Sequence, residues 1–140
     1  MRTISFVQRL SRDERGSAMV EFAIIAVIFF IPFIFGTIEF GRMAWAKNTV
    51  TAAAREGVRY AIVHGSAAGA AGGSIADSAA VANYVKGRTQ LGGITVKTTW
   101  IPAKDPGDTV QVEVRYNYTS LIPIVPAKQL RGISRQIIAY

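Results

Sequence analysis

Residues 15–22 read Arg15-Gly16-Ser17-Ala18-Met19-Val20-Glu21-Phe22, and they decide how this 140-residue chain is organised. A basic segment ends in a glycine, and an apolar run follows that continues to Ile38. A helix that spans a membrane needs about 20 mostly apolar residues, and residues 18–38 meet that length. No charged residue lies between Glu21 and Glu39. The sequence therefore predicts one membrane-spanning helix with a single acid near its start.

The acid at position 21 needs a reason. A carboxylate in a spanning helix costs about 2.5–3.5 kcal/mol at the bilayer centre and less near its edge. One interpretation is a side chain that reaches the interface and has no function. The other is a role in assembly, in which the charge meets a partner inside apolar surroundings.

The motif resembles the leader of type IV pilin-like proteins, which a prepilin peptidase cuts after the glycine. On this resemblance the cut follows Gly16, Ser17 becomes the new N-terminus, and Glu21 is the hallmark acid of the fifth mature position. Further residues resemble the TadE-type minor pilins of the tight-adherence (Flp) pilus system: Val20-Glu21-Phe22-Ala23, Pro32 and Glu39-Phe40-Gly41-Arg42. The resemblance covers about residues 12–60.

The resemblance implies a minor pilin or pseudopilin that helps to assemble an adhesive pilus. Its partners would be the prepilin peptidase, other pilin or pseudopilin subunits, the pilus secretion machinery and the inner membrane. Glu21 of one subunit would pair with the Ser17 amine of a neighbour and set their axial register. The implied site residues are Gly16 and Ser17 for processing, Glu21 and Phe22 for assembly, and Pro32, Glu39, Gly41 and Arg42 as family markers.

The charge of the chain indicates its orientation. Four arginines lie in residues 1–15, which by the positive-inside rule predicts a cytoplasmic N-terminus and a C-terminal domain outside, periplasmic or extracellular. The formal net charge is +7, but the basic residues form no dense run with interleaved aromatics. A nucleic-acid partner is therefore not expected.

Three segments follow from this pattern: a basic leader over 1–16 that is cleaved, a transmembrane helix over 17–40 and an extracytoplasmic domain over 41–140. Pro32 predicts a kink in the apolar helix. The helix is expected to continue over 41–63, because apolar residues recur there at three- and four-residue spacing. This amphipathic face consists of Met43, Ala46, Val50, Ala53, Gly57 and Ala61.

The rest of the domain changes its period. Residues 64–73 are rich in Gly and Ala and predict a loop. A short helix over 75–88 is expected, with Ser74 and Asp77 as a capping box and with Ile75, Ala79, Ala82 and Val85 buried. Alternating apolar residues predict strands at about 94–101, 109–118 and 132–140. The expected fold is α+β, with the long N-terminal helix packed on a small antiparallel sheet.

The remaining polar residues form no pattern that predicts a catalytic or metal-binding site. The chain has no Cys and one His, His64, so neither a disulfide nor a metal site is expected. Asp105 and Asp108 flank Pro106-Gly107 and fit a turn. Glu39 and Arg42 are three residues apart and fit an ordinary ion pair at a helix end. No nucleophile or phosphate-binding motif is present, so neither an enzyme nor a cofactor is expected.

Two other functions are compatible with parts of the sequence. Ala44-Trp45-Ala46 fits the small-residue rule of ordinary signal peptidase, and a cut after Ala46 would release a secreted binding protein. An unprocessed single-pass anchored protein is the other alternative. It leaves Gly16 and Glu21 unexplained.

Overall fold

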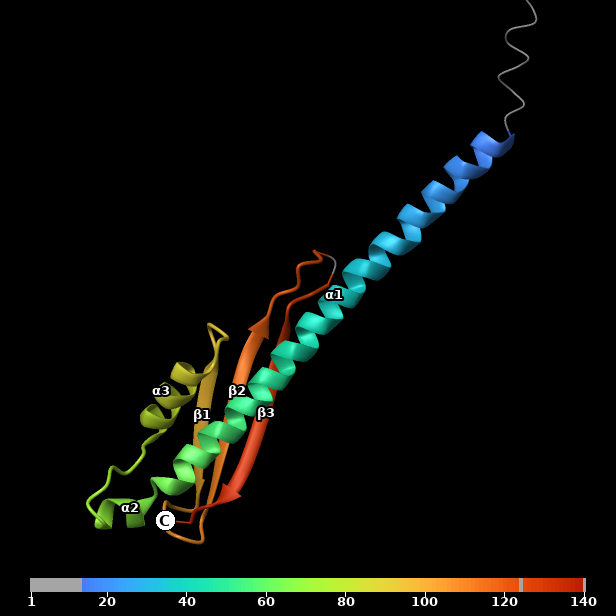
Figure 1. Ribbon diagram of the computed structural model, residues 1–140. Coiled ribbons are helices and arrows are strands. Elements are labelled where there is room, and N and C mark those ends of the chain that lie inside the picture. Colours follow the sequence, from blue (N-terminus) through green and yellow to red (C-terminus); the bar gives the residue numbers. More distant parts are fainter. Residues whose placement is uncertain (1–13, 124, 140) are drawn as a thin grey trace, which may run out of the picture. The chain divides into compact units, whose positions relative to one another are not determined.

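A computed structural model describes residues 14–123 and 125–139 (Figure 1). The elements are α1 (Glu14–Val63), α2 (Ser66–Ala70), α3 (Ser78–Arg88), β1 (Thr95–Ile101), β2 (Thr109–Tyr118) and β3 (Lys128–Ile137). The predicted α+β fold class is therefore confirmed. The chain forms two compact units, one up to residue 38 and the other from residue 39 to the C-terminus.

The first unit is the apolar half of α1. The helix begins at Glu14, so the last residues of the expected leader are helical, and residues 1–13 lie outside the described part. One glycine costs about 1 kcal/mol relative to alanine, and helices extend readily once nucleated. Gly16 is therefore too weak a breaker to end the helix. The helix also continues through Pro32.

The second unit is a three-stranded antiparallel sheet with the order β1-β2-β3. One face of β2 is apolar, and the amphipathic half of α1 and helix α3 cover this face. The buried core is built from small and branched side chains: Val50, Ala54, Val58, Ala61, Ala76, Val81, Val85, Leu91, Ile94, Val110, Val112, Val114 and Ile138. The predicted face of α1 is largely the one that packs, since Ala46, Val50 and Ala61 are buried.

Two glycines let these layers approach closely. A Cβ at Gly132 in β3 would lie 2.6 Å from the Val50 carbonyl oxygen of α1. A Cβ at Gly57 would lie 2.7 Å from Val85 Cγ2 and 3.0 Å from Val112 Cγ1. Real Cβ atoms do not make contacts under 3.0 Å. The packing distance between α1 and the sheet therefore depends on Gly57 and Gly132.

The start of α3 differs from the prediction. Asp77 is the N-cap, and its Oδ1 accepts a hydrogen bond from the Ala80 amide at 2.6 Å. Asp is as good an N-cap residue as Ser. With Asp77 as the N-cap, Ala76 and Val81 occupy the two positions of a hydrophobic staple, and both are buried. The capping box at Ser74 was wrong. Ile75 is 49% exposed and Ala79 is exposed too, so the predicted burial of both was wrong, because the later start of α3 turns these positions toward solvent; Val85 is buried as predicted.

Two further boundaries differ. The predicted Gly/Ala loop contains α2, because Ser66-Ala-Ala favours a helical turn and the Ser66 amide is held by the Lys104 carbonyl at 3.0 Å. The third strand runs from Lys128 to Ile137, not over 132–140. It begins earlier because Leu130 is buried against Ala46 and Tyr118.

Candidate functional site

The segment expected to carry the function lies on α1. Ser17, Glu21 and Phe22 are exposed side chains of this helix. Ser17 and Glu21 are four residues apart, so they lie on one face about one turn from each other. The Gly16–Ser17 peptide bond belongs to the first turn of the helix.

Large apolar side chains of this segment are uncovered. Phe22, Phe29 and Phe33 are each about 70% exposed, at 70%, 69% and 72%. A soluble chain rarely leaves so continuous an apolar surface in water. Within the described residues, α1 is the one helix long and apolar enough to cross a membrane. These properties are consistent with a membrane anchor.

Glu39 is the first residue of the second unit, and its side chain is buried. Its Oε1 accepts a hydrogen bond from Tyr118 Oη at 2.7 Å, and its Oε2 accepts one from the Leu121 amide at 3.3 Å. Arg42 Nη1 donates to Oε2 at 3.2 Å, and Arg42 Cζ lies 5.6 Å from the centroid of the Tyr118 ring. The Glu39–Arg42 ion pair predicted from sequence is present, but its surface position was wrong, because the Glu39 carboxylate is buried. Glu39 fastens the end of β2 and the loop after it to α1.

Tyr118 is the main partner in this cluster, and it is 3% exposed. Burial, and then the hydrogen bond to Glu39, raises the pKa of its phenol above the ordinary value. The phenol therefore stays protonated and remains a donor. A buried carboxylate with three donors is well satisfied, so the cluster holds a fixed geometry at the point where the second unit begins.

Gly41, another family-marker residue, has no packing partner among the described residues. A Cβ at Gly41 would meet no atom within 4 Å, and the same is true of Gly36. Neither glycine is explained by packing in one copy of the chain.

A second carboxylate cluster lies on the sheet face that points away from α1. Glu113 Oε1 accepts from Arg115 Nε at 2.5 Å and from Arg131 Nε at 2.6 Å. The hydrogen bond from Arg115, followed by that from Arg131, lowers the pKa of the Glu113 carboxyl below its usual value. Sequence reasoning missed this cluster. The sequence does place an acid and a base, Glu113 and Arg115, two residues apart on one face of a predicted strand, and this spacing could have indicated the pair.

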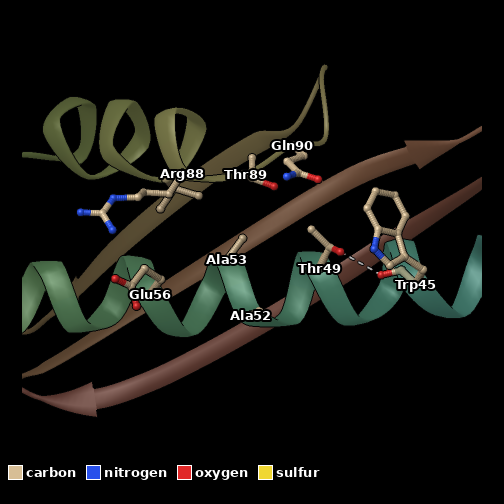
Figure 2. A pocket seen from close by; sticks show the side chains of 9 residues that line it. Trp45, Thr49, Ala52, Ala53, Glu56, Arg88, Thr89 and Gln90 are labelled. Carbon is tan, nitrogen blue, oxygen red and sulfur yellow. Dashed lines mark hydrogen bonds between the residues drawn. The ribbon is translucent and has the colours of Figure 1, made fainter.

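A pocket of about 430 Å³ lies between α1 and the C-terminal end of α3 (Figure 2). Trp45, Ala52, Ala53 and Glu56 of α1 line the pocket together with Arg88 of α3. Glu56 already accepts a hydrogen bond from Tyr84 Oη at 3.0 Å. This bond, and then burial, raises the pKa of the Tyr84 phenol. The Glu56 carboxylate in this pocket is therefore already hydrogen-bonded to Tyr84.

The residues considered for metal or acid–base chemistry have structural roles. His64 Nδ1 donates to the Tyr60 carbonyl at 2.9 Å. Asp108 Oδ2 accepts from the amides of Ala103 and Asp105, each at 3.2 Å, as a turn aspartate does. In the part of the chain that is described, no group of three His, Asp or Glu residues could hold a metal ion.

The architecture defines the class of protein: a small α+β domain preceded by one apolar helix that is consistent with a membrane anchor. Residues 16–59 match the family model described as TadE-like protein. The resemblance found in the sequence is thereby confirmed over these residues, and it supports a protein related to the Tad pilus. The matched segment contains both the Gly16–Glu21 motif and Glu39. A search of curated proteins and a search of solved structures each found no match.

Proposed function

We propose that this chain is a minor pilin or pseudopilin of a tight-adherence pilus, processed by a prepilin peptidase after Gly16. The observation that carries the proposal is the exposed apolar helix whose only charged side chain between Ser17 and Ile38 is Glu21. The match to the TadE-like family supports a role in this system. A compact unit from residue 39 to the C-terminus, which adds helices α2 and α3 and a sheet to the end of α1, supports a minor subunit, since the major subunits of the resembling pili have little beyond the helix.

Processing would change the charge pattern of the helix. Hydrolysis of the Gly16–Ser17 bond leaves a carboxylate on the leader and a new ammonium on Ser17. An uncompensated carboxylate in apolar surroundings is penalised, whereas a paired one is tolerated. Glu21 of one subunit would therefore accept the Ser17 ammonium of a neighbouring subunit. This contact fixes how far one helix is displaced along the next.

The partners follow from this sequence of events. The precursor meets the prepilin peptidase in the inner membrane, with its basic N-terminus in the cytoplasm. The mature helix then packs with other pilin or pseudopilin subunits at the pilus secretion machinery. We propose no enzymatic activity for the chain, because its buried carboxylates and its histidine are engaged in structural contacts.

A cut by signal peptidase after Ala46 fits the geometry poorly. Ala46 is 2% exposed and packs with Tyr118 and Leu130. The cut would also remove Glu39 from Tyr118 and Leu121. A mature protein starting at Lys47 would lose the contacts that hold the loop after β2.

A pair of glycine variants tests the processing step. Gly16→Val is expected to leave full-length precursor in the inner membrane. Gly36→Val lies in the same helix, and a Cβ there meets no atom within 4 Å, so it is expected to be processed like the wild type. Immunoblots of membrane fractions separate precursor from mature protein. Normal processing of Gly16→Val defeats the proposal.

The assembly step has its own variant. Glu21→Gln keeps the size of the side chain and removes its charge. We expect cleavage to continue and incorporation into pili to fail, measured on sheared pili. Undiminished incorporation of this variant would show that the charge has no role in assembly.

A further inference from the structure

The outer edge of β3 is open for pairing. Within the described residues the sheet order is β1-β2-β3, so no strand pairs with the far side of β3 (Figure 1). The strand is 10 residues long. Such an edge presents a row of N–H and C=O groups to which another strand can add. We propose that the edge of β3 binds an extended acidic segment of a partner protein by strand addition.

The hydrogen bonds identify which groups face outward. The Ile138 amide donates to the Asp108 carbonyl at 2.7 Å, and the Ile138 carbonyl accepts from the Gly107 amide at 3.0 Å. Alternate residues of an antiparallel strand direct their backbone groups to opposite sides. The backbone N–H and C=O groups of the even-numbered residues of β3 therefore point toward β2, and those of the odd-numbered residues point to the outer edge. Independently, Lys47 Nζ of α1 donates to the Arg131 carbonyl, so this carbonyl points to the outer edge, where an added strand would have to displace or share the Lys47 contact. The outward set is Gln129, Arg131, Ile133, Arg135 and Ile137.

The charge of this edge selects the partner. The side chains of the outward set are exposed, on the sheet face opposite α1. In the three strands Glu113 is the single acid, whereas this face carries Lys97, Arg115, Arg131 and Arg135. Arg131 is bound to Glu113, whereas among the residues the structure describes Arg135 bonds only to the neutral Gln111. An added strand with carboxylates opposite Arg131 and Arg135 places them four residues apart.

The apolar contacts refine this segment. Ile133 lies between the two arginines and is 45% exposed, so a β-branched residue midway between the carboxylates would pack on it. On the other face of the added strand, a pocket of about 420 Å³ lies between α1 and residues 128–131. Met43, Ala44 and Lys47 line it. It can receive a small side chain of the incoming strand, and Lys47 adds positive charge.

A second copy of this chain is a poor occupant of the edge. Antiparallel pairing of two β3 strands about Ile133 would set Arg131 of each copy opposite Arg135 of the other. Like charges directly opposite each other on adjacent strands are destabilising. The charge therefore favours a different, acidic protein. This inference does not depend on cleavage after Gly16.

The test is a titration of the synthetic peptide Thr-Val-Glu-Thr-Val-Thr-Glu-Val-Thr into the full-length protein in a non-ionic detergent. Calorimetry is expected to show saturable binding of one peptide per chain. Hydrogen exchange is expected to slow at the amides of Ile133 and Arg135. A peptide with Lys in place of Glu, and one N-methylated at alternate amides, are both expected to bind at least about tenfold more weakly.

Two protein variants locate the contact. Arg135→Glu is expected to weaken binding about tenfold, since it exchanges an attraction for a repulsion. Lys86→Glu makes the same charge change on an exposed residue of α3 and is expected to bind like the wild type. Equal binding of the N-methylated peptide would show surface electrostatics only and overturn strand addition. Absence of binding, or dimerisation of the chain through β3, would also overturn the proposal.

Discussion

Substituting Gly132 by alanine tests the packing of α1 on the sheet. The new Cβ would lie 2.6 Å from the Val50 oxygen, 2.8 Å from the Val50 carbonyl carbon and 2.9 Å from Thr51 Cα. All three are backbone atoms, so no side-chain rotation relieves the overlap. An ordinary contact begins at 3.4 Å, and α1 and β3 must separate by several tenths of an ångström.

The cost follows from this displacement. Overpacking a core costs about 1–3 kcal/mol, and rigid backbone places Gly132→Ala at the upper end. The lower entropy of the unfolded alanine chain returns about 0.4–1 kcal/mol. The net loss is about 2 kcal/mol, which in a domain of about 100 residues lowers Tm by about 8–15 °C.

The assay is thermal unfolding of the full-length protein in non-ionic detergent, followed by tryptophan fluorescence. A Trp45→Phe background leaves Trp100, which packs against the core, as the reporter. Gly87→Ala is the matched control, because it lies inside α3 and its Cβ meets no atom within 4 Å. It is expected to raise Tm, since Gly in a helix costs about 0.5–1 kcal/mol relative to Ala. An unchanged Tm in Gly132→Ala would refute the close packing.

Three further predictions concern single contacts. Glu39→Ala leaves the buried Tyr118 hydroxyl without its acceptor; we expect a lower Tm and faster hydrogen exchange at Leu121, and equal exchange would contradict the cluster. The lowered pKa of Glu113 means that its contribution is present at neutral pH and is lost as pH falls through the folded pKa; the urea midpoint should fall in acid, and less so in Glu113→Gln. Asp77→Ala removes the cap of α3 and should cost about 0.5–2 kcal/mol in urea unfolding, whereas Ser74→Ala should have little effect.

Local periodicity predicted much of the fold. The apolar run and the three- and four-residue spacing after it predicted a long helix with two different halves, and α1 continues to Val63. Alternation predicted the strands at 94–101 and 109–118, because β-branched side chains repeat there with period two. These features depend on neighbours close in sequence, so a single sequence contains them.

The structure differs from the sequence predictions where contacts between residues far apart in the sequence determine burial or the ends of an element. The burial of Glu39 is not predictable from its neighbours in sequence, because its partners Tyr118 and Leu121 lie 79 and 82 residues away. The start of β3 depends on the burial of Leu130 against Tyr118. Leu130 is flanked by polar residues in the sequence, so local periodicity does not predict a strand there. The N-cap of α3 is Asp77 and not the predicted Ser74. Both residue types can cap a helix, so residue type alone does not distinguish them. Processing after Gly16 and pairing of Glu21 remain predictions.

The N-terminus of the protein isolated from its native membrane is the most direct measurement. Intact-mass and N-terminal peptide mass spectrometry are expected to show a chain that begins at Ser17, whose new amine lies one helical turn before Glu21. A chain that retains Met1, or one that begins at Lys47, would contradict a pilin-like subunit released by a prepilin peptidase.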